Sequence, residues 1–137
     1  PDNFPEPTAP FSYGILTGNK KRGYRLKICG QIGKHYSNGQ LPSDFSQQML
    51  NVLNNIEFVL ADVGWNFSNV VSSRVLLADL GYYAEMNDIY IANFPPPCPA
   101  REAYSVKELP LGALVEIVCD AEGDDVSDKS MEKYSIE

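Results

Sequence analysis

The chain has 137 residues, of which 44% are hydrophobic and 21% charged, a composition typical of one soluble globular domain. Its net charge of −7 counts against nucleic-acid binding, which relies on basic side chains that neutralise phosphates. No apolar run approaches the roughly 18 residues of a membrane span. The three cysteines lack a paired spacing, and His35 lacks clustered ligands, so we expect no disulfide framework, no metal site and, by default, cytosolic residence.

Proline and charge divide the chain into three parts. Residues 1–9 are rich in proline and are expected to form an extended arm. Residues 10–122 carry the regular patterns and are expected to form a single domain. Residues 123–137 are polar and acidic and are expected to form a loosely ordered tail.

Two strands are predicted before the first helix. Residues 11–16 could form a short one. Residues 24–33 alternate with a period of two, which places Gly30 on the face of Ile28 and Gln31 on the opposite face. Without a side chain, Gly30 lets another group approach its backbone, although a bulge or tight sheet packing would also explain it.

Apolar spacings of three and four residues predict helices over 44–63 and 82–93. Asp44 is the expected N-cap of the first helix, and Gly64 is its expected C-terminal cap. In the second helix Asn87 lies beside the apolar stripe, where it is either exposed or hydrogen-bonded to the sheet or a site.

Three further strands are predicted over 70–78, 103–106 and 113–120. The resulting element order indicates an α+β fold, with one sheet and two helices on one of its faces. Because the strands carry apolar residues on both faces, we expect oligomerisation to bury the second face.

Two charged residues indicate a site for a small anion. Arg101 follows the stiff segment 94–99, and its planar fork suits a carboxylate. Glu116 lies among apolar residues, where a carboxylate is costly to bury unless it has a function. Taken alone, Arg101 could form a structural ion pair, and Glu116 could be an exposed edge-strand carboxylate.

A series of short motifs carries a family resemblance between residues 10 and 122. In chain order they are Pro10-Phe11-Ser12, Gly30-Gln31-Ile32-Gly33, Asn55, Gly64, Asn69-Val70-Val71, Leu77-Ala78-Asp79, Asn87-Asp88-Ile89-Tyr90, Pro99-Ala100-Arg101, Leu109-Pro110, Gly112-Ala113 and Val115-Glu116-Ile117. With these motifs in this order, the chain resembles the RidA/YjgF family of reactive-intermediate imine deaminases.

The resemblance implies a chorismate-mutase-like fold, with a six-stranded mixed sheet and two helices. It also implies a homotrimer whose sheets form a central barrel, with a site in each of three subunit clefts. The implied reaction is hydrolysis of 2-imino or 2-enamino acids, such as 2-iminopropanoate, to 2-keto acids and ammonia, without a cofactor.

The resemblance also implies residue roles. Arg101 matches the arginine that binds the substrate carboxylate, and Glu116 matches the glutamate that positions or activates water. Gly30, Asn87 and Ala103 match positions that line the pocket. Phe11 matches a substrate-binding position where the family usually has tyrosine, so its hydroxyl is missing here.

Two other functions remain open at this stage. One is the single-stranded RNA endonuclease activity attached to older family names, which the acidic charge and the lack of a histidine or metal pair disfavour. The other is a non-catalytic trimeric protein, chaperone-like or sensing small carboxylates.

Overall fold

The structure, a computed structural model, describes residues 13–127. Phe11, the N-terminal arm and residues 128–137 lie outside this range. The described elements are β1 (Gly14–Asn19), β2 (Gly23–Ile32), α1 (Phe45–Asp62), β3 (Val70–Leu77), α2 (Tyr83–Asn93), β4 (Ala100–Ser105) and β5 (Val115–Gly123), with three short 3₁₀ turns between them.

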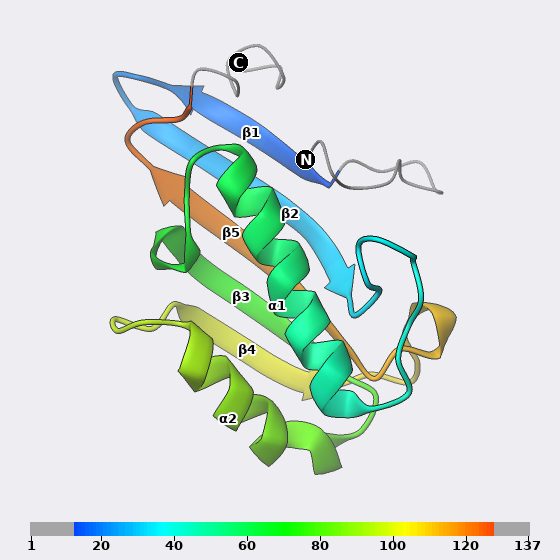
Figure 1. The fold of residues 1–137 in the computed structure, drawn as a ribbon. Coiled ribbons are helices and arrows are strands. Elements are labelled where there is room, and N and C mark those ends of the chain that lie inside the picture. The colour runs from blue at the N-terminus through cyan, green and yellow to red at the C-terminus, as the bar shows by residue number, and fades with distance from the viewer. Residues whose placement is uncertain (1–12, 128–137) are drawn as a thin grey trace.

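The strands form one mixed sheet in the order β1-β2-β5-β3-β4. Only β3 and β4 pair in parallel, and α2 makes the connection between them. Figure 1 shows α1 and α2 on the same face of the sheet, as predicted. The α+β class and the element order are therefore confirmed. The sixth strand that the resemblance implied is not among the strands of residues 13–127.

Helix α1 begins and ends where its capping residues predict. The side chain of Asp44 accepts a hydrogen bond from the backbone N–H of Gln47. Gly64 follows the helix with a φ of 85°, a conformation that glycine adopts without a steric penalty. Met49, Val52 and Ile56 are completely buried against the sheet. None of the helices within residues 13–127 is long and apolar enough to cross a membrane.

Three buried polar side chains of α1 hold the loops at the end of the sheet. Asn51 donates to the carbonyl of Gly33, and Asn55 donates to those of Ile32 and Lys34. Gln48 accepts from the backbone N–H of Leu114, just before β5. Because buried amides need partners, these bonds fix the end of β2 and the start of β5 relative to α1.

A bulge in β2 corrects the predicted alternation at Gly30 and Gln31. Ile28 pairs with Cys119, and the next registered pair is Gln31 with Ile117. The partner strand advances two residues while β2 advances three, so β2 carries one extra residue there. Gln31 therefore joins Ile28 on the helix-covered face, where it is buried, and Gly30 turns to the open face.

The open face of the sheet is covered by no helix of residues 13–127, because α1 and α2 both lie on the other face (Figure 1). Its exposed apolar side chains include Ile15, Val71 and Tyr104. It also carries ion pairs between neighbouring strands, such as Arg25 with Glu122 at 3.1 Å. The open face is therefore more polar than the sequence predicted, since the strands were expected to carry apolar residues on both faces.

Candidate functional site

Arg101 lies on β4 beneath the N-terminal half of α2. Its Nη1 donates to Oδ1 of Asn87 at 2.7 Å, and its Nη2 donates to Oη of Tyr83 at 3.2 Å. Nη1 also lies 3.7 Å from the sulfur of Met86. The guanidinium carbon stands 4.9 Å from the ring centroid of Tyr90, within cation–π range. The strand begins at Ala100, three residues earlier than predicted, so Arg101 is part of the sheet.

Every partner of Arg101 within residues 13–127 is neutral. Its contacts are an amide oxygen, a phenol oxygen, a thioether and aromatic rings. A structural ion pair was the alternative role for Arg101, and no such pair is formed in the described part of the chain. Nε makes no hydrogen bond there either, and Nη2 donates one of its two N–H groups to Tyr83, so Nε and Nη2 each keep an N–H group for a carboxylate.

Tyr83, Asn87 and Tyr90 recur at the spacing of one helix face, and all three contact Arg101. Tyr90 is buried, and its hydroxyl lies 2.6 Å from Oγ of Ser73 on β3. Ser73 is in register with Arg101, so this bond ties α2 to the sheet beside the guanidinium. Asn87 therefore reaches the sheet, the second of its two predicted alternatives.

Glu116 lies on the open face, opposite Gly30. A Cβ atom added to Gly30 would stand only 2.9 Å from Cδ of Glu116, closer than real Cβ contacts come. The missing side chain of Gly30 is therefore the space that the Glu116 carboxylate occupies. Both structural expectations for Gly30 are met, because it lies in a bulge and the side chain of Glu116 approaches its backbone.

Burial raises the pKa of the Glu116 carboxyl above its ordinary value, and no neighbouring charge contributes to the shift. Desolvation disfavours the charged form of an acid, so this carboxyl binds its proton more tightly than an exposed one. Glu116 is therefore not a simple exposed carboxylate. Within residues 13–127 of one copy, no cation lowers its pKa.

Cys29 precedes Gly30 and shares its surroundings. Burial raises the pKa of its thiol, and the nearby Glu116 raises it further, while a hydrogen bond from Gln31 lowers it. Nε2 of Gln31 lies 3.1 Å from the sulfur. Since the thiolate is the nucleophilic form, the raised pKa makes Cys29 a poor nucleophile near neutral pH.

The two charged residues lie on opposite faces of the same sheet. Arg101 is in register with Ser73, and Glu116 is in register with Leu76, three positions further along β3. Side chains alternate between faces, so an odd separation places them on opposite sides. Ala103 lies on the face of Arg101. One copy thus brings Arg101, Asn87 and Ala103 together, and Gly30 with Glu116 separately.

Comparison with known proteins identifies the family. The family model described as Endoribonuclease L-PSP matches residues 2–123. The chain belongs to this family.

Relatives within the L-PSP family are named for imine chemistry. The 2-iminobutanoate/2-iminopropanoate deaminase of Mus musculus is 42% identical over 110 residues, which cover 80% of this chain and 82% of that protein. The enzyme of the same name from Bos taurus is 37% identical over 114 residues, covering 82% and 80%. The crystal structure of RidA from an Antarctic Psychrobacter superposes with a TM-score of 0.81 at 31% identity, covering 88% of this chain and 94% of that one.

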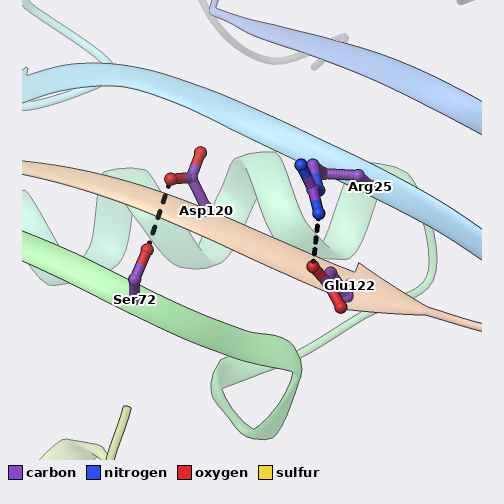
Figure 2. A network of polar contacts seen from close by, with 4 residues as sticks. All are labelled: Arg25, Ser72, Asp120 and Glu122. Carbon is purple, nitrogen blue, oxygen red and sulfur yellow. Dashed lines mark hydrogen bonds and ion pairs between the residues drawn. The ribbon is translucent and has the colours of Figure 1, made fainter. Parts of the chain in front are cut away.

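The open face of this L-PSP family member also carries a groove away from the predicted site residues. It has a volume of about 370 Å³ and lies between β1, β2, β5 and β3. Figure 2 shows its polar contacts, in which Arg25 pairs with Glu122 and Ser72 donates to Asp120 at 3.2 Å. No residue predicted for the site lines this groove.

Tyr83 was not among the predicted site residues. Its aromatic side chain fits the apolar spacing of the second helix, yet the residue is exposed and its hydroxyl accepts a hydrogen bond from Arg101. Its position four residues before Asn87 was a usable signal, since residues at that spacing share one helix face.

Proposed function

We propose that this protein hydrolyses small 2-imino acids, such as 2-iminopropanoate, to 2-keto acids and ammonia. The observation that carries the proposal is the Arg101 guanidinium held by neutral partners, in a chain whose relatives are named 2-iminobutanoate/2-iminopropanoate deaminase. A cation without an internal counter-charge is suited to bind a substrate that brings its own carboxylate.

In this proposal the Nε–Nη2 edge of Arg101 binds the substrate carboxylate in a bidentate manner. Asn87 fixes the guanidinium through its 2.7 Å bond to Nη1. Ala103, two residues further along β4, lines the same side of the pocket. The small side chain at this position leaves the strand backbone accessible to the substrate.

Glu116 serves as the base for the attacking water. Its carboxylate takes one proton from water as the oxygen adds to C2 of the protonated imine, which gives a carbinolamine with a hydroxyl and an amine on C2. Glu116 then returns this proton to the amine nitrogen, and the C2–N bond breaks to release ammonia. The remaining hydroxyl proton is lost to the Glu116 carboxylate or to water as the C2–O bond becomes the carbonyl of the keto acid. A carboxyl with a raised pKa accepts a proton more readily, as a general base near neutral pH requires.

A site that uses both Arg101 and Glu116 needs two copies of the chain, because the two residues lie on opposite faces of the sheet. We infer that Arg101 and Asn87 of one subunit face Gly30 and Glu116 of its neighbour across a subunit cleft. The uncovered open face, with its exposed apolar side chains, supports an assembly in which that face is buried. The substrate carboxylate held by Arg101 would then lie near Glu116, the base supplied by the neighbouring subunit.

The function is tested by ammonia release from 2-iminopropanoate generated in the assay by an amino-acid oxidase. We expect the wild-type protein to accelerate release and Arg101→Ala to lose at least about a hundredfold in kcat/KM, since a charge-assisted bidentate contact is lost. Arg101→Lys keeps the charge but not the fork and should fall between them. Arg22→Ala, at an exposed turn, is the matched control. Equal rates with and without wild-type protein would contradict the proposal.

A further inference from the structure

Tyr83 is an aromatic residue at the start of α2 with one side exposed. Its hydroxyl oxygen accepts a hydrogen bond from Nη2 of Arg101 at 3.2 Å, and the guanidinium carbon lies 5.8 Å from its ring centroid. The residue is 40% exposed, so core packing alone does not explain its position. No other hydrogen bond of this hydroxyl is found within residues 13–127.

The contacts of Arg101 fix the rotation of its planar fork. Asn87 accepts from Nη1 and Tyr83 accepts from Nη2, so one acceptor stands at each terminal nitrogen. A planar group held at two points cannot turn about its long axis without breaking one of the bonds. The edge formed by Nε and Nη2 then keeps a single direction.

We propose that Tyr83 is a positioning residue, whose hydroxyl aims Arg101 so that its Nε–Nη2 edge faces the carboxylate of the ligand. This inference rests on the proposed function, because it assigns the same carboxylate to Arg101. The inference adds Tyr83 as a residue on which the orientation of the Arg101 guanidinium depends. Bidentate recognition depends on direction more than on charge, so a freely rotating guanidinium would bind the carboxylate less tightly.

The ring and the hydroxyl of Tyr83 can be separated by substitution. Tyr83→Phe keeps the ring beside the guanidinium and removes the oxygen that accepts from Nη2. Tyr36→Phe is the matched control, because Tyr36 also packs on an aromatic neighbour, Phe58, and lies in a loop that contributes no proposed site residue.

The first measurement is the dissociation constant of pyruvate, the keto acid expected from 2-iminopropanoate, by calorimetric titration. Binding needs no turnover, so it can be measured in inactive variants. Tyr83→Phe should weaken pyruvate binding roughly tenfold, as loss of a hydrogen bond to a charged group predicts. Tyr36→Phe should bind as the wild type does, and both variants should keep the wild-type melting temperature.

A double-mutant cycle with Arg101→Lys distinguishes positioning from a general effect on the pocket. Lysine is a point charge with no fork to orient, so removing the hydroxyl should cost little further affinity in the lysine background. An equal loss in both backgrounds would overturn the positioning role.

The outcomes for the two proposals are separate. If Arg101→Ala abolishes pyruvate binding while Tyr83→Phe binds within about twofold of the wild type, the role of Tyr83 is wrong and the proposed function stands. Pyruvate binding that survives in Arg101→Ala would overturn both, because the carboxylate would then be held elsewhere. A wild-type protein that does not bind pyruvate would likewise remove the ligand that Tyr83 is proposed to serve.

Discussion

The chemistry of Glu116 depends on its surroundings more than on its residue type. It is half-buried on the open face of β5, and burial raises its pKa. Because the pKa is higher in the folded state, the free energy of folding is less favourable when this carboxyl is ionised. This carboxyl therefore stabilises the fold most at pH values below its ordinary pKa, and that contribution is lost as pH rises through the raised pKa.

Glu116→Gln is expected to lower kcat by about 10²–10⁴-fold, the usual contribution of a general base, with a smaller effect on pyruvate binding. In the wild type kcat/KM should fall as pH decreases through the raised pKa, because the base becomes protonated. This acidic limb should lie above the ordinary carboxyl range and be absent in the variant. Glu57→Gln, exposed on α1, is the control. Unchanged kcat in Glu116→Gln, or an equal loss of activity and melting temperature, would contradict the catalytic role.

Asn87, whose amide oxygen accepts from Nη1 of Arg101, provides a second prediction for a single residue. Asn87→Asp has nearly the same shape but places a carboxylate 2.7 Å from the guanidinium, so an internal ion pair competes with the substrate. We expect KM to rise at least about tenfold, while the protein stays folded. Asn54→Asp adds the same charge on an exposed face of α1 and should leave KM unchanged. A wild-type KM in Asn87→Asp would show that Arg101 does not hold the carboxylate.

The elements that carry regular patterns were predictable from the sequence, and their irregularities were not. Apolar spacing and capping residues located α1, whose observed bounds lie one residue inside the predicted ones. The alternation of β2 failed at Gly30 because a bulge depends on pairing with β5, which a single strand does not encode. The early start of β4 depends in the same way on its register with β3.

Two glycines at the end of β2 should respond differently to alanine. At Gly30 the added Cβ meets the flexible end of Glu116, whereas at Gly33 it would lie 2.8 Å from the carbonyl carbon of Gln48 in the backbone of α1. Gly30→Ala should therefore lower kcat by displacing the carboxylate, with little change in the melting temperature. Gly33→Ala should cost about 1–3 kcal/mol of stability, because backbone must shift. Thermal melts and ammonia release on both variants test this, and the reverse assignment would contradict it.

At the scale of the whole molecule, the question is how Arg101 and Glu116 could act together. The sequence predicted Arg101 and Glu116 as chemical partners, but the sheet places them on opposite faces. Residue chemistry and the family resemblance both predicted this pairing, but strand patterns alone did not show that the two side chains lie on opposite faces. The contact between Tyr83 and Arg101 depends on how α2 packs over β4, which local sequence does not specify.

We predict that the protein is a homotrimer, because no helix of residues 13–127 covers the open face of its sheet and its proposed site is divided between the two faces. Analytical ultracentrifugation at micromolar concentration should give three times the mass of the chain. Substituting Val71, an exposed apolar residue of that face, with aspartate should dissociate the assembly and abolish ammonia release together. The same substitution at Ile91, exposed on α2, is the control. An active monomer would exclude the composite site.

The most direct test of the account is complementation between two inactive variants. Arg101→Ala and Glu116→Gln chains, carrying different tags, are co-expressed, and the mixed oligomers are purified and assayed for ammonia release from 2-iminopropanoate. In a purified mixed trimer about one third of the sites should be intact, because a site forms only where a Glu116→Gln chain supplies Arg101 and an Arg101→Ala chain supplies Glu116. A site shared between two subunits predicts this partial recovery. Mixed oligomers no more active than the separate variants would contradict it.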